Sequence, residues 1–232
     1  TSRSMPFASK SYGVNLMEVS AAILAGRGLE VRWPDSEVRP GVHVPEEGIW
    51  SVKSPQFSWA QIRGAYPFLG PEMRSTGEVA AMGLSFREAL LKSWMAAAPN
   101  RIPGPDRTAL IYGRGLERAQ RAMARAGYGC TTLRGAAVRG CAELDPEDAV
   151  RTIKGGEVGI LMTDGYMPDV DYRVRRAAVD HNVPVVLNRD LAAEVAAAME
   201  EYMNGRLDLG VMELREYWDE GSRRRGMLSR AL

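Results

Sequence analysis

Cysteine and histidine, the residue types that most often bind transition metals, are rare in this sequence. It holds two of each, at Cys130, Cys141, His43 and His181. A four-ligand zinc site would need all of them, and their spacing fits no zinc-binding pattern. Two cysteines are also too few for a disulfide framework. We therefore expect no metal site in this chain, and we expect both cysteines to be reduced thiols of a cytoplasmic protein.

The common nucleotide-binding loops are missing as well. Neither G-x-x-x-x-G-K-[ST] nor G-x-G-x-x-G occurs in the 232 residues. Such loops bring backbone N–H groups to the phosphates of a nucleotide, and their glycines allow that close approach. A nucleotide site built on either loop is therefore excluded.

The overall composition is that of an ordinary globular protein. Hydrophobic residues make up 45%, charged residues 25%, and the net charge is +1. So balanced a charge produces no global field that would attract nucleic acid or a membrane surface. No apolar run approaches the roughly 20 residues that span a bilayer, and residues 1–10 lack the core of a signal peptide. The abrupt start at Thr1 indicates a processed protein, an expression fragment or one subunit of a split protein.

The first hundred residues contain few regular elements. Apolar residues at near-helical spacing predict a helix over 10–26, ended by Gly26 and Gly28. Residues 33–48 and 64–71 have the composition of loops and turns. Residues 49–59 look extended, and Pro55 limits them to an edge strand because proline cannot donate to a ladder. A second helix is predicted over 85–97, with Ser85 as its cap and Glu88 completing a capping box.

The pattern changes after residues 99–105, where three prolines and a glycine form a linker. Short apolar strands then alternate with helices, which predicts a parallel sheet covered on both faces. The expected strands are 108–112, 129–133, 158–163 and 183–187, and the expected helices 116–126, 146–154 (capped by Asp145), 173–181 and 191–203. A short helix over 211–218 and a basic run at 223–225, most simply a solvated tail, follow.

Three segments resemble one known family. Residues 69–79 read LGPEMRSTGEV, which resembles a signature of the carbamoyl-phosphate synthase large subunits. Residues 2–10, SRSMPFASK, and the strand residues 51–53, SVK, resemble two further segments of that family in the same order. The resemblance implies an α/β protein: a C-terminal portion of an ATP-grasp synthetase domain (1–98), a linker (99–106), a Rossmann-like methylglyoxal-synthase-like domain (107–205) and a tail (206–232).

The resemblance also implies an activity, the ATP-dependent formation of carbamoyl phosphate from bicarbonate and from ammonia or glutamine nitrogen. Arg3 matches an arginine that faces the phosphoryl-transfer site of the family, whereas the alternative is an arginine that holds a chain terminus. Arg74 and Glu78 match residues beside the active site and the carbamate passage, whereas the alternative is a buried Arg–Glu pair that fixes a turn. Lys53 is interpreted as structural.

The cofactor and partners implied by the resemblance lie largely outside this sequence. The ligands for ATP with Mg²⁺ would precede Thr1, so the chain alone would not bind MgATP productively. The implied partners are the other ATP-grasp portion of the large subunit and a glutamine amidotransferase small subunit, in an oligomeric assembly. The alternative is a non-catalytic regulatory or assembly module, whose partner chains hold all the chemistry.

The last domain of the family binds allosteric effectors at the ends of its parallel strands. A phosphorylated effector would contact Thr132, Arg134, Gly135 and Arg114 in this sequence. Ala136 stands where the family has a second threonine, and a lysine of the family is absent, so we expect weak binding. The alternative is a vestigial domain that is kept for packing and oligomer contacts.

Overall fold

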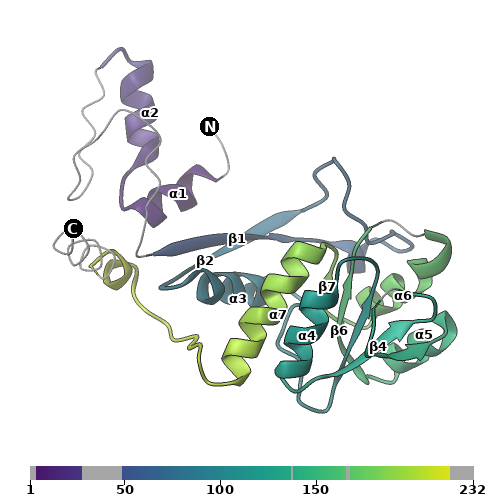
Figure 1. Ribbon diagram of the computed structural model, residues 1–232. Helices are drawn as coiled ribbons and strands as arrows, with labels where there is room; N and C mark the ends of the chain where they lie inside the picture. The colour runs from purple at the N-terminus through teal and green to yellow at the C-terminus, as the bar shows by residue number, and fades with distance from the viewer. Residues whose placement is uncertain (1–3, 28–48, 137, 166–167, 220–232) are drawn as a thin grey trace.

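The computed structural model describes residues 4–27, 49–136, 138–165 and 168–219, with the side chains of 168–170 left out. A five-stranded parallel sheet of order β5-β4-β3-β6-β7 forms its centre, and a two-stranded antiparallel ribbon, β1-β2, lies beside it (Figure 1). The sheet strands are β3 Thr108–Tyr112, β4 Gly129–Leu133, β5 Ala142–Leu144, β6 Val158–Thr163 and β7 Val185–Val186. The predicted mixed α/β class with a parallel sheet is confirmed.

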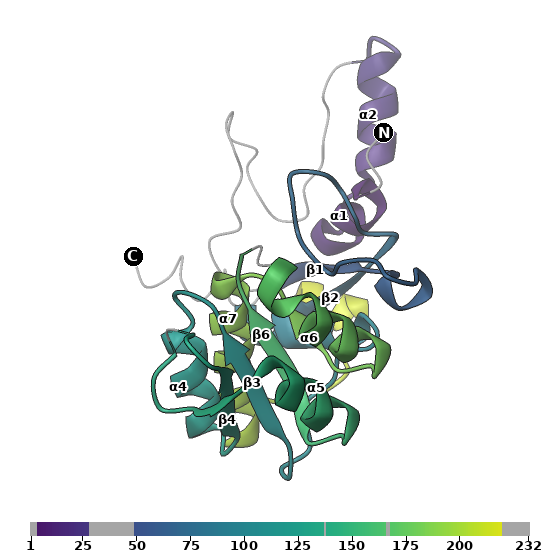
Figure 2. The ribbon, with the colours of Figure 1, turned by 90° about the vertical axis from the view of Figure 1, so that its right-hand side faces the viewer.

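Helices cover both faces of this sheet (Figure 2). One face packs against α4 (Glu117–Arg125) and α7 (Arg189–Met203), and the other against α5 (Pro146–Lys154) and α6 (Pro168–Asp180). Successive strand residues alternate between the two cores: Ile111 lies in the first and Tyr112 in the second. All six residues of β6 are buried, as expected for a central parallel strand.

The ribbon consists of β1 (Trp50–Gln56) and β2 (Gly77–Gly83), and α3 (Phe86–Ala96) follows it. The Ser85 side chain caps α3 by accepting the N–H of Glu88 at 3.2 Å, and the Glu88 carboxylate accepts the N–H of Leu84 at 2.8 Å. The predicted capping box is confirmed with one difference: the Glu88 carboxylate accepts from the N–H of Leu84 and not from that of the cap residue, Ser85. Leu91 and Trp94 of α3 enter the same core as α7.

Several predicted bounds were wrong. The single helix over 10–26 is two helices, α1 (Met5–Tyr12) and α2 (Leu16–Leu24), because Gly13 adopts a left-handed φ of 68° that ends the first. Helix α6 begins at Pro168 rather than at 173, and β7 has only two residues. Strands β2 and β5 were not predicted.

The loop between β1 and β2, residues 57–76, is docked onto α6. The Arg176 guanidinium donates to the backbone carbonyls of Trp59, Ile62 and Ala65 at 2.9–3.3 Å. The Tyr172 hydroxyl donates to the carbonyl of Gly64 at 2.9 Å. The loop includes the short 3₁₀ helix η1 (Trp59–Gln61). Backbone carbonyls that would otherwise need water are thus satisfied by α6.

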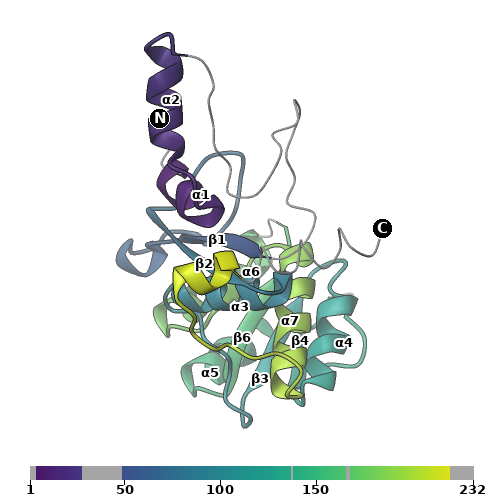
Figure 3. The same ribbon diagram turned by 90° about the vertical axis from the view of Figure 1, so that its left-hand side faces the viewer.

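The segment after α7 runs back to the first part of the chain (Figure 3). Residues 214–219 are helical, close to the predicted helix over 211–218. The Tyr217 hydroxyl donates to the carbonyl of Met82, and the Trp218 indole N–H donates to the carbonyl of Lys10. The basic run 223–225 lies outside the described residues. In the described part of the chain, no helix is both long and apolar enough to cross a membrane.

The expectation of reduced thiols is wrong, since Cys130 and Cys141 form a disulfide with their Cα atoms 4.7 Å apart. The pairing of Thr131 with Ala142 between β4 and β5 places the two cysteines side by side. The two cysteines are close only because β5, an edge strand that was not predicted, pairs with β4. The Cα separation lies in the range that a disulfide can bridge.

Reduction of this disulfide should destabilise the fold. Because it closes a short loop with a sequence separation of 11, chain-entropy arguments give about 2–3 kcal/mol. Thermal unfolding in the presence of a reductant should then occur about 5–10 °C lower. The Cys130→Ser, Cys141→Ser double variant should unfold at that lower temperature with or without reductant. A wild-type midpoint unchanged by complete reduction would contradict the assignment.

Candidate functional site

The first group of predicted site residues lies on the β1–β2 ribbon. Arg3 lies outside the described residues, but its neighbour Ser4 is described. The Lys53 ammonium donates to Ser4 Oγ at 2.7 Å and to a carboxylate oxygen of Glu78 at 2.7 Å. Because Lys53 pairs with Ala80 and Pro55 with Glu78, Lys53 and Glu78 are diagonal neighbours on one face of the ribbon. The ribbon thus brings the residue after Arg3 together with Glu78.

Lys53 was interpreted as structural, and its contacts agree with that interpretation. It joins two segments that are 49 and 25 residues away from it in sequence. The ion pair is only partly covered, with 37% and 39% of the two side chains exposed. Such a pair contributes at most about 1 kcal/mol to stability.

Arg74 lies apart from Glu78. Its guanidinium stacks over the ring of Phe68, 5.2 Å from the centroid, and its closest carboxylate is Glu72 at 4.0 Å. The side chain of Arg74 is 40% exposed. The alternative interpretation, a buried Arg74–Glu78 pair that fixes a turn, is therefore wrong. Both charges remain accessible to a substrate or to another chain.

The second group lies at the carboxyl ends of the parallel strands. Gly135 has a left-handed φ of 77° and follows β4, so the chain turns there. The Arg134 guanidinium pairs with Asp145 at 3.2 Å. Asp145 makes no side-chain cap bond to α5, so its predicted capping role is replaced by this ion pair. The Thr132 side chain is buried, and its hydroxyl has no hydrogen-bond partner in the described structure.

Arg114 is exposed in the turn after β3, at the same edge of the sheet. Arg189, which the sequence analysis missed, lies close by: its guanidinium is 4.0 Å from Asp164, and its side chain lies 3.0 Å from where a Cβ on Gly115 would be. The signal was its place at the start of a helix that follows a parallel strand. The structure therefore places three arginines, 114, 134 and 189, at the carboxyl edge of the sheet.

A buried polar cluster closes the other face of this edge. Arg175 and Asp171 on α6 are fully buried and paired at 2.6 Å, and the Tyr66 hydroxyl donates to Asp171 at 2.6 Å. Burial raises the pKa of the Tyr112 hydroxyl, which lies near this pair. Among the described residues, the hydroxyls of Tyr112 and Thr163 have no hydrogen-bond partner. Tyr66 in the loop docked on α6 thus contributes to this buried cluster.

No metal site is formed by the described residues, because they contain no group of three histidine, cysteine or acidic side chains that could hold a metal ion. On the β1–β2 ribbon, Lys53 and Glu78 form an ion pair, and Arg74, in the loop between the two strands, is partly exposed. The arginines at the sheet edge are suited to weak phosphate binding.

The chain is similar to known proteins over a length that includes both groups of predicted site residues. Over 94% of its length, the chain is 48% identical to the carbamoyl phosphate synthase large chain of Pyrococcus furiosus. The large chain of Hyperthermus butylicus is 49% identical over 94% of this chain, and that of Saccharolobus islandicus 42% over 93%. The chain is similar to a C-terminal part of carbamoyl phosphate synthase large chains. It spans about one fifth of their length, 20% in each case. No protein-family model matches it.

The similarity covers the ribbon and the parallel sheet together. The resemblance of residues 69–79 to a large-subunit signature is therefore confirmed as part of a similarity over nearly the whole chain. The roles of Arg3, Arg74 and Glu78, and those of the effector residues, stay predictions.

Proposed function

We propose that this chain is the C-terminal component of a carbamoyl phosphate synthase, an ATP-dependent ligase. Residues 1–98 would complete the site at which carbamate is phosphorylated, and residues 107–205 would form the effector domain. The observation that carries the proposal is the bridge from Lys53 to Ser4 and Glu78, which joins the segment of Arg3 to the signature. Cations around a transferring phosphoryl group stabilise its developing charge.

The missing chemistry would come from other polypeptide. MgATP would be held by the remaining ATP-grasp portion of the large subunit, and ammonia would come from a glutamine amidotransferase small subunit. The assembly would be oligomeric and cytoplasmic. The three arginines at the sheet edge support weak effector binding, whereas the buried cluster of Arg175 and Asp171 supports a domain kept for packing.

Helices α1 and α2 support the need for a partner. Neither contains a buried residue. Ile23 is 49% exposed and Leu24 88% exposed, and the two helices project from the end of the ribbon (Figure 1). An amphipathic helix normally buries its apolar side chains against other elements. We propose that the other ATP-grasp portion covers this surface.

Coexpression tests the proposal directly. The chain should copurify with a polypeptide that carries the rest of the large subunit, and carbamoyl phosphate synthesis should require both. The Ile23→Asp, Leu24→Asp variant should lose copurification, because each charge would be buried without a partner, at several kcal/mol in total.

A matched control is Val211→Asp, since Val211 is 99% exposed on another segment. It should copurify like the wild type. Equal behaviour of the two variants would contradict the proposed surface. If the chain copurified but its partner made carbamoyl phosphate at the full rate without it, the non-catalytic regulatory or assembly module would instead be favoured.

A further inference from the structure

A basic hollow lies on the face of the sheet that α4 and α7 cover, and it shares no residue with either group of predicted site residues. It has a volume of about 400 Å³ and opens between α4 and α7, with α3 beside them. Its floor is made of small side chains, Ala122, Ala193 and Ala197, and its walls carry five arginines. We call it the arginine groove; its arginines are Arg87, Arg118, Arg121, Arg125 and Arg206.

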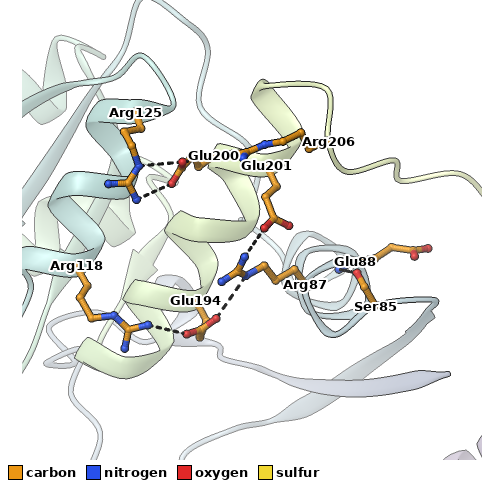
Figure 4. Close-up of polar contacts among 9 residues, drawn as sticks. All are labelled: Ser85, Arg87, Glu88, Arg118, Arg125, Glu194, Glu200, Glu201 and Arg206. Atoms are coloured by element: carbon orange, nitrogen blue, oxygen red, sulfur yellow. Dashed lines mark hydrogen bonds and ion pairs between the residues drawn. The ribbon is translucent and has the colours of Figure 1, made fainter. Parts of the chain in front are cut away.

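Three carboxylates of α7 hold most of these arginines (Figure 4). Glu200 accepts both Nε and Nη2 of Arg125, at 2.9 and 2.8 Å, and this bidentate bond holds the pKa of Glu200 below its ordinary value. Glu200 is also 3.3 Å from Arg206. Glu194 is 3.2 Å from Arg118 and 3.6 Å from Arg87. Glu201 pairs with Arg87 as well.

The charges of the groove do not balance. Five guanidinium groups face three carboxylates, which leaves two positive charges in excess. Arg121 lies on the same face of α4 as Arg118 and Arg125, at spacings of three and four residues. Its side chain forms no ion pair or hydrogen bond with any described residue. Arg118 keeps a single carboxylate contact and is 68% exposed.

We propose that the arginine groove binds a small dianion of the phosphate-ester class. The guanidinium of Arg121, which has no partner among the described residues, and the singly paired one of Arg118 would hold its oxygens, and two negative charges would balance the excess. Guanidinium groups suit such an anion because their planar N–H donors match its oxygens in pairs. The alanine floor leaves the space in which the anion would lie. This site shares no residue with the effector residues predicted at the sheet edge, and it goes beyond the proposed function.

Calorimetric titration of the full chain with inorganic phosphate tests the site. At low ionic strength we expect a Kd of about 1 mM or tighter. Arg121→Gln should weaken binding by about tenfold, the effect of one charge-assisted contact. The matched control is Arg173→Gln on α6, which removes an exposed arginine that lies outside the groove and pairs with Glu147, and it should leave the Kd unchanged. Similar losses in both variants would overturn the proposal.

Glu194→Gln should act in the opposite direction and strengthen binding several-fold, because it frees Arg118 and adds one positive charge to the groove. Binding should also weaken from about pH 8 to about pH 5.5, since phosphate passes from dianion to monoanion while arginine stays charged. Absence of binding at about 10 mM phosphate and low salt would overturn the site. So would a Glu194→Gln variant that binds more weakly than the wild type. Neither result would bear on carbamoyl phosphate synthesis.

Discussion

Replacement of Arg175 by alanine is expected to destabilise the protein by about 3–5 kcal/mol. Arg175 donates to Asp171 at 2.6 Å, to the carbonyl of Gly165 at 2.6 Å and to that of Pro67 at 3.2 Å. The variant leaves a carboxylate and two carbonyls in a buried place without their main donor, and desolvation of the charge dominates the loss. The midpoint of thermal unfolding should fall by about 10 °C or more.

Two further variants separate the buried charge from lost packing. Arg173→Ala, two residues earlier on α6, removes an arginine that is 73% exposed and should cost at most about 0.5 kcal/mol. Arg175→Met combined with Asp171→Leu removes both charges and keeps the volume, so it should recover much of the loss of the single variant. A double variant that is less stable than Arg175→Ala would show that the pair itself stabilises the fold.

The central strands could be predicted because a strand that is buried on both faces appears in the sequence as a continuous apolar run. Residues 158–163 form one apolar run, and the structure has β6 at those bounds. Strand β2 was missed because Gly77, Ala80 and Ala81 carry little β-propensity and the segment was interpreted as a motif. Strand β5 has three residues at a sheet edge, with Ala142 and Glu143 exposed, so no burial pattern marks it. The disulfide was missed for the same reason.

The candidate site shows a similar division. The signature located Glu78 in the sequence, but its pairing with Lys53 depends on the register of a ribbon whose second strand was not predicted. The docking of residues 57–68 on α6 depends on backbone carbonyls, which have no signature in the side chains. The arginine groove combines residues of α3, α4 and α7, and their helical spacing indicates only a charged face. Contacts between distant elements decide these features, and a single sequence does not contain them directly.

In the assembled enzyme, Arg3→Ala is expected to lower carbamoyl phosphate synthesis by roughly 10²–10³-fold, the effect of losing one oriented donor to a transition state. A metaphosphate-like transition state spreads negative charge over its oxygens. A fixed guanidinium stabilises that charge more than it stabilises the ground state, so its loss raises the barrier. Ser4, the residue after Arg3 in the sequence, accepts a hydrogen bond from Lys53.

The measurement compares two partial reactions in the reconstituted assembly. The family resemblance implies that the bicarbonate-dependent ATPase reaction takes place in the other half of the enzyme. It should then stay within about twofold of wild type, because only a transition-state contact of the second step is lost. Arg151→Ala is the matched control: the Arg151 side chain is 77% exposed on α5, and its loss should affect neither reaction. Equal loss of both partial reactions in Arg3→Ala, or loss of neither, would return Arg3 to the role of holding a chain terminus.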